Sequence, residues 1–201
     1  MIEYRSVFLF SACHSHRTYF PSKDTLPDVS LQIIRFDSAL LTIGDTTTIY
    51  QDVQGLYHSY PVFMPVWVED IIGIPTYDTA YLCRQLPLFL NDTVYGFKQT
   101  NAREQELFSS VTDIHEPMCD AFRRLAYIDS TIIIPDIYLF ISGFNASIMF
   151  VEDDIAVGAD MYLGSDYEYY NRVVYEYQKY TMRKECIPVD VVSAYMFRHY
   201  P

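Results

Sequence analysis

GFNASIMFVEDDIAVGADMYLG, residues 143 to 164, is the stretch that decides the fold of this chain. Its first half, from Ala146 to Val151, is rich in residues that favour strands. The acidic triplet Glu152 to Asp154 interrupts the apolar run, as a turn between two strands does. From Ile155 onward, apolar residues alternate with small or polar ones, which is the period of a strand. The stretch therefore predicts a hairpin near residues 146–163.

The two faces of the second strand differ in chemistry. The odd-numbered residues from Ile155 to Leu163 are apolar and need a core, whereas the even-numbered residues are small or polar. Gly158 on the second face indicates that another group approaches the backbone closely there. We expect Asp160 and Tyr162 to be exposed on this face and, with Asn145, to form a candidate binding face. The alternative is an Asp160 carboxylate bonded to a helix N-terminus or to a tyrosine hydroxyl.

A tyrosine-rich segment follows the hairpin. Ser165 with Glu168 three residues later is a capping-box pattern, which predicts a helix from Asp166 to about Lys184. Its tyrosines cannot all be buried on one helix, so we expect some of them to face solvent or a partner. They are Tyr167, Tyr169, Tyr170, Tyr175, Tyr177 and Tyr180.

The remaining patterns are mainly helical. Short strands are expected within residues 31–36 and 131–142, and a long helix within 101–127, which Pro117 should kink or split. Trp67 is expected to pack inward. The sum is an α+β fold, mostly helical with a small antiparallel sheet that includes the hairpin. Residues 31–201 are expected to form a single domain.

Composition limits the classes of partner. A chain of 201 residues that is 50% hydrophobic, with only 7 Gly, is globular and long enough for a sizeable core. Its formal net charge of −12 argues against nucleic acid and anionic lipid head groups as partners. We therefore expect no nucleic-acid partner.

The N-terminal region suggests a lipid anchor. Cys13 follows an apolar run that ends in small residues, as in a bacterial lipoprotein signal, so Cys13 is the candidate lipidation site. Residues 1–13 are then the remnant of a signal and residues 14–30 a tether, although a chance cysteine is the alternative. Because no stretch approaches about 18 apolar residues, membrane attachment would be by acyl chains only. The other cysteines are expected to be buried thiols, or to include one disulfide whose pairing the sequence does not fix.

Several pieces, taken in order, resemble the gliding-motility-associated lipoprotein family called GldB. The resemblance covers roughly residues 25 to 201. It implies an envelope lipoprotein of a Gram-negative bacterium, related to the gliding and secretion apparatus, with no established catalytic activity. Members continue with further helices, so we expect the domain to lack a C-terminal part. The pieces are Ile34-Arg35-Phe36-Asp37, Ile134-Pro135-Asp136-Ile137-Tyr138, Ser142-Gly143-Phe144-Asn145, Asp160-Met161-Tyr162-Leu163-Gly164, Tyr169-Tyr170, and Tyr180 with Met182, Arg183-Lys184 and Ile187-Pro188.

The family pattern is distantly similar to zinc peptidases, which need HExxH on one helix. This chain has 5 His and no HExxH, and His115-Glu116 is followed by Pro117. No catalytic triad or phosphate-binding glycine loop is present either.

We therefore predict a non-catalytic, lipid-anchored protein of the periplasmic side or outer membrane. It would contact other envelope proteins and carry neither cofactor nor metal. The first alternative is a zinc-peptidase-like hydrolase, or a degenerate relative, whose metal-binding part is missing. The second is a small-ligand module that uses the Asp160 face.

Overall fold

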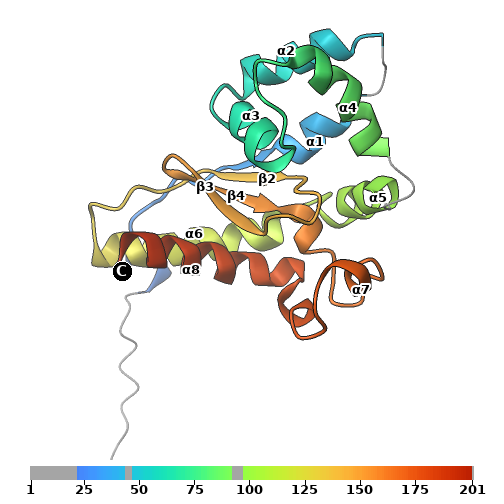
Figure 1. Cartoon of the computed structure of the whole chain (residues 1–201). Helices are drawn as coiled ribbons and strands as arrows, with labels where there is room; N and C mark the ends of the chain where they lie inside the picture. The colour runs from blue at the N-terminus through green and yellow to red at the C-terminus, as the bar shows by residue number, and fades with distance from the viewer. Residues whose placement is uncertain (1–21, 44–46, 92–96, 201) are drawn as a thin grey trace, which may run out of the picture.

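The computed structural model describes residues 22–43, 47–91 and 97–200, and a four-stranded sheet lies between two helical layers (Figure 1). The strands are β1 (Ile33–Arg35), β2 (Ile137–Phe140), β3 (Ile148–Val151) and β4 (Asp154–Gly158), in the order β1-β2-β4-β3. The β3–β4 pair is antiparallel, whereas β1–β2 and β2–β4 are parallel. The α+β class is confirmed, but the sheet is mixed. The expectation of an antiparallel sheet is wrong for two reasons. β1 and β2 are joined through the helices between them and run parallel, and the hairpin adds its second strand, not its first, to β2.

The hairpin itself is confirmed. Its turn consists of Glu152 and Asp153, because Val151 pairs with Asp154. Glu152 adopts a left-handed φ of 54°, which both favoured forms of a two-residue hairpin turn require of their first residue. The second strand is shorter than predicted: β4 ends at Gly158 and continues as the 3-10 helix η3 (Ala159–Met161).

Gly158 is a point of close approach, as the sequence predicted. A Cβ on this residue would lie 2.0 Å from the carbonyl oxygen of Ala146. The Gly158 N–H donates to the carbonyl of Ser147 at 3.0 Å, so the two segments are held together here. Only glycine allows the end of β4 to lie this close to the chain that enters β3.

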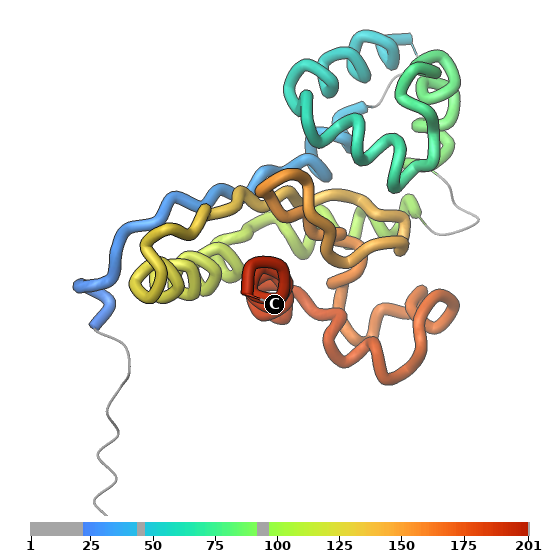
Figure 2. The backbone as a smooth tube through the Cα atoms, turned by 60° about the vertical axis from the view of Figure 1, so that its left-hand side comes forward, coloured from blue at the N-terminus to red at the C-terminus, as the bar shows by residue number. Residues whose placement is uncertain are grey.

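One layer consists of α6 (Thr112–Ile128) and α8 (Ile187–His199), which lie side by side under the sheet (Figures 1 and 2). The apolar face of α6 packs with Val191 and Tyr195 of α8 against Ile155 and Val157 of β4. The predicted helix 101–127 is split at residues 108–111, between α5 (Phe97–Leu107) and α6. Pro117, which was expected to kink or split the helix, lies within α6, and the interruption occurs before it.

Carbonyl groups at this interruption are satisfied by two cations from distant segments. The guanidinium of Arg35 donates to the Phe108 carbonyl at 2.5 Å. The ammonium of Lys184 donates to the carbonyls of Leu107 and Ser110 at 3.1 and 2.6 Å. These long-range donors replace the helical hydrogen bonds that the carbonyls would otherwise accept.

The other layer covers the opposite face of the sheet. It comprises α1 (Phe36–Leu41), α2 (Ile49–Ser59), α3 (Phe63–Val66), the π-helical turn η2 (Trp67–Ile71) and α4 (Thr79–Asn91). Trp67 is fully buried, as predicted, and its indole N–H donates to the Ile141 carbonyl at 2.9 Å. This bond ties the helical layer to the chain that leaves β2.

The segment from 165 to 186 is not the predicted helix. It contains only the short α7 (Tyr170–Val173) and the 3-10 turns η4 (Lys179–Thr181) and η5 (Lys184–Cys186). A bridge between Leu163 and Arg183 and a bond from the Gly164 N–H to the Met182 carbonyl close it into a loop. Because both ends are fixed at one point, a continuous helix of this length does not fit, and the loop projects beside α8 (Figure 2).

The chain before β1 differs in part from a free tether. It contains the 3-10 turn η1 (Lys23–Thr25), and Leu26 is buried. Lys23 forms an ion pair with Asp120 of α6 at 3.0 Å. The expected tether thus contacts the domain through Lys23, Leu26 and Val29, whereas its other described residues are exposed. Residues 1–21, which include Cys13, lie outside the described residues.

Candidate functional site

Asp160 is a buried clamp on the turn that follows β2. Its Oδ1 accepts from the Ser142 N–H at 2.9 Å, and its Oδ2 accepts from the Ser142 hydroxyl at 3.0 Å and the Phe144 N–H at 2.7 Å. The side chain is fully buried, so the expectation that it is exposed is wrong. The reason is register: Phe140 pairs with Gly158 in parallel strands, and residues two positions further along both chains meet.

Opposing effects act on the Asp160 carboxyl. Burial raises its pKa, and the donors of Phe144 and Ser142 act in the opposite direction because they favour the charged form. Because donors point at both carboxylate oxygens of Asp160, a side chain at this position has to offer two acceptors.

The clamped turn holds an unusual backbone. Gly143 and Phe144 both have left-handed φ angles, 66° and 62°. For Phe144 this conformation costs about 1–2 kcal/mol, which the Asp160 bonds help to offset. The result is that the Phe144 ring stacks on Tyr169 at 4.7 Å between centroids. Asn145 follows directly and is exposed, so of the predicted face only this residue is at the surface.

Tyr170 joins the clamp to the next loop. It is fully buried, and its hydroxyl donates to the Asp160 carbonyl at 2.8 Å and accepts from the Leu163 N–H at 2.8 Å. Burial raises the pKa of this phenol, so the hydroxyl stays protonated and available as a donor.

A second buried polar group lies between the clamp and α1. Arg35 donates from Nε and Nη2 to the Asp37 carboxylate, the shortest of these bonds being 2.6 Å. Glu104 of α5 is fully buried, and neither of its oxygens has a hydrogen-bond donor among the described residues. Burial, together with the charges of Asp37 and Asp160, raises its pKa well above the usual value. These causes favour a neutral carboxyl at Glu104.

Tyr162 is also buried, contrary to expectation, because its ring turns under the loop 165–186. Its hydroxyl donates to Asp190 Oδ2 in the first turn of α8 at 2.9 Å. Burial and the neighbouring Asp190 raise the pKa of the Tyr162 hydroxyl, so it remains a donor. A cavity of about 340 Å³ opens over this pair, with Tyr177 among its lining residues.

The loop 165–186 presents an exposed aromatic group, which we call the tyrosine surface: Tyr175, Tyr177 and Tyr180. They are 73%, 71% and 69% exposed. The rings of Tyr175 and Tyr177 are stacked, 5.9 Å apart and 7° from parallel. The prediction that some tyrosines of this segment are exposed is thus confirmed for these three, whereas Tyr170 is buried.

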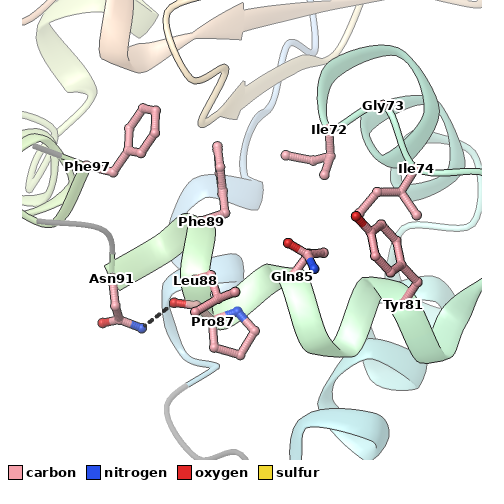
Figure 3. A pocket seen from close by; sticks show the side chains of 10 residues that line it. All are labelled: Ile72, Gly73, Ile74, Tyr81, Gln85, Pro87, Leu88, Phe89, Asn91 and Phe97. Carbon is pink, nitrogen blue, oxygen red and sulfur yellow. Dashed lines mark hydrogen bonds between the residues drawn. The ribbon is translucent and has the colours of Figure 1, made fainter. Parts of the chain in front are cut away.

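A larger cavity, about 620 Å³, lies between α4 and the turn that follows η2 (Figure 3). Its walls are mainly apolar, with Phe89, Leu88 and Ile74 among them, and Tyr81 at one end. The Asn91 side-chain amide there donates to the Pro87 carbonyl at 3.0 Å. None of the described residues that line the cavity carries a carboxylate or a cationic group, so this lining suits apolar groups.

Residues with metal-binding or nucleophilic chemistry are dispersed. His115 bonds to the Leu31 carbonyl at 2.9 Å and lies 3.5 Å from the Cys119 sulfur. Within the described ranges, no three His, Cys, Asp or Glu side chains form a group that could hold a metal ion. Cys83, Cys119 and Cys186 are free thiols, and burial raises the pKa of the first two. No helix in the described part of the chain is long and apolar enough to cross a membrane.

The sequence model of a family described as gliding motility protein GldB matches residues 21–201. The chain belongs to this GldB family. No curated protein matches it, and no solved structure does. Membership links the chain to the gliding machinery as a lipoprotein associated with the cell envelope.

In this GldB-family chain, the pieces that carried the resemblance meet around the clamp. Asp160 accepts from Ser142, and Tyr170 donates to the Asp160 carbonyl. Lys184 donates to the Ser110 carbonyl, between α5 and α6. Sequence reasoning missed Glu104, because an acidic residue in a polar helix gives no sign of burial. It also missed Asp190, whose role depends on Tyr162, 28 positions away.

Proposed function

We propose that this GldB-family protein is a non-catalytic, lipid-anchored envelope component that acts through protein–protein contacts at the tyrosine surface. The observation that carries the proposal is the exposure of Tyr175, Tyr177 and Tyr180 on one loop. Tyrosine supplies a large apolar ring and a polar hydroxyl at low conformational cost, and it is enriched in interfaces.

The loop that bears the tyrosine surface is held in place from within. Lys179 is buried and donates to Asn171 and to Glu176, the latter at 2.5 Å. The Gln178 side chain accepts from the Tyr175 N–H at 2.9 Å. Because these bonds order the loop before any partner arrives, binding would cost little additional ordering entropy.

The anchor in this proposal is Cys13, and the site of action is the periplasmic side or the outer membrane. Family membership and the apolar run before Cys13 support it. Mass spectrometry of the native protein extracted from membranes tests it. We expect an acylated N-terminal Cys13, and an unacylated mature chain that starts elsewhere would refute the anchor.

The contact surface is tested by cross-linking in the native envelope. We expect the double substitution Tyr175→Ser and Tyr177→Ser to remove at least one cross-linked protein that the unmodified chain captures. The matched control is Tyr77→Ser, which removes a tyrosine that is 87% exposed in another part of the fold. Equal thermal midpoints for the variants would show that both fold. Unchanged cross-linked products in the double variant would refute the tyrosine surface as the contact.

A further inference from the structure

The cavity beside Tyr162 lies under the tyrosine surface and combines one carboxylate with aromatic and polar groups. Asp190 and the Tyr162 hydroxyl contribute its polar floor, and Tyr177 belongs both to the cavity and to the tyrosine surface. Ser147, Gln178 and Thr181 add hydroxyl and amide groups. Any partner that covers the tyrosine surface would therefore also cover this cavity.

Asp190 has no cationic partner within ion-pair distance in the described ranges. Its carboxylate accepts one bond, from Tyr162. The basic residues of the overlying loop are all engaged elsewhere: Arg172 lies over the Tyr169 ring, Lys179 pairs with Glu176, Arg183 donates to the Tyr180 carbonyl, and Lys184 pairs with Asp113. A half-buried carboxylate without a cation has been partly desolvated without the Coulombic gain that a partner would supply.

We propose that this cavity binds a lysine or arginine side chain of the partner protein. This proposal rests on the proposed function, since it assigns a chemistry to the same contact surface. Asp190 would pair with the charged group, and the Tyr177 ring would face it as a cation–π partner. Met161, Met182 and Val174 line the cavity and suit the aliphatic stem of such a side chain. The chain's net charge of −12 would also favour the approach of a basic partner.

Other ligand chemistries fit less well. An anion would meet the Asp190 carboxylate, which already lies in the first turn of α8 and interacts with the positive end of that helix. A divalent metal ion needs several oxygen, nitrogen or sulfur ligands, and the described part of the cavity offers one carboxylate. A single basic side chain is satisfied by one carboxylate, one ring and neutral acceptors.

The first experiment titrates the protein with small probes and follows methyl signals by NMR. The probes are the amides of acetyl-lysine and acetyl-arginine, with acetyl-glutamine amide as the neutral control. Met161 and Met182 line the cavity, so labelled methionine methyl groups report on it directly. We expect a basic probe to shift both signals in a saturable way, and the neutral probe to leave them unchanged.

Substitutions then test the assigned groups. Asp190→Asn keeps an oxygen acceptor for the Tyr162 hydroxyl but removes the charge, and should weaken binding of the basic probe at least tenfold. Tyr177→Leu keeps an apolar wall and should weaken it severalfold. Asp153→Asn, at the exposed hairpin turn, is the matched control and should not change it. Equal shifts with the neutral probe, or undiminished binding in Asp190→Asn, would overturn the proposal.

Native-envelope cross-linking separates this proposal from the proposed function. If Asp190→Asn and the tyrosine double variant lose the same partner, the basic side chain is supported. If only the tyrosine variant loses it, the contact surface stands and the cavity assignment fails. If neither variant loses a partner, the proposed function itself fails.

Discussion

Replacing Asp160 with Asn tests the clamp at the end of the parallel strand pair. Asn can keep one oxygen for the Ser142 N–H, and the Ser142 hydroxyl can rotate to accept from the new amide. The Phe144 N–H then faces an NH₂ group in place of an oxygen. One charge-assisted bond is lost and one buried donor is left unpaired, without any change in side-chain volume.

The magnitude follows from these two changes. A hydrogen bond to a charged group contributes about 1.5–3 kcal/mol, and an unpaired buried donor costs about 1–3 kcal/mol. Burial of the Asp160 charge acts in the opposite direction, as the raised pKa of this carboxyl indicates. We therefore expect the free energy of unfolding to fall by about 3 kcal/mol, near the low end of the sum. For a domain of this size that lowers the thermal midpoint by about 6–12 °C.

The assay is urea unfolding followed by circular dichroism, with Asp153→Asn as the matched control. Asp153 is exposed in the same hairpin, so its substitution should change stability by less than about 0.5 kcal/mol. A near-ultraviolet spectrum should also change, because the clamp positions Phe144 on Tyr169. If Asp160→Asn and Asp153→Asn have the same stability, the carboxylate does not hold this turn and the reasoning fails.

Three further substitutions test other parts of the fold. Gly158→Ala places a Cβ 2.0 Å from a backbone carbonyl and should cost about 3 kcal/mol by thermal unfolding, whereas Gly55→Ala, exposed in α2 with nothing within 4 Å, should stabilise by about 0.5–1 kcal/mol. Equal effects would contradict the close approach. Glu104→Gln should stabilise by about 1–3 kcal/mol at pH 7, by urea unfolding, because the buried carboxyl has to take up a proton on folding whereas the amide is already neutral. The pKa of Glu104 is raised in the folded state, so the contribution of Glu104 to stability falls as pH rises from the unfolded pKa of about 4.3 towards the folded pKa. The stability gained by Glu104→Gln should therefore shrink near pH 4. A gain independent of pH would refute a neutral Glu104. Trp67→Phe should cost about 1–2 kcal/mol, because the Ile141 carbonyl loses its donor, and an unchanged chemical denaturation midpoint would argue against that bond.

Local patterns predicted the elements whose character is local. The alternation and acidic turn of the hairpin, the close approach at Gly158 and the burial of Trp67 all follow from residue type and short-range spacing. The same reasoning failed for residues 165–186, where a capping-box pattern predicted a helix. There the Leu163–Arg183 bridge imposes a closed loop, and a long-range constraint outweighs helix propensity.

The sequence predicted some residues of the candidate site but not where their side chains lie. The sequence singled out Asp160 and Tyr162 because polar residues in an alternating strand have to be explained, and it indicated that the tyrosines after Ser165 would not all be buried. Whether a polar side chain points into the core or to solvent depended on the order of the strands. Because β4 lies beside β2, Asp160 lies against Ser142, 18 positions earlier. By itself, the sequence determined the α+β class, the hairpin and the family. Only the tertiary structure decided which polar groups are buried, because a buried carboxylate depends on donors that non-local pairing supplies.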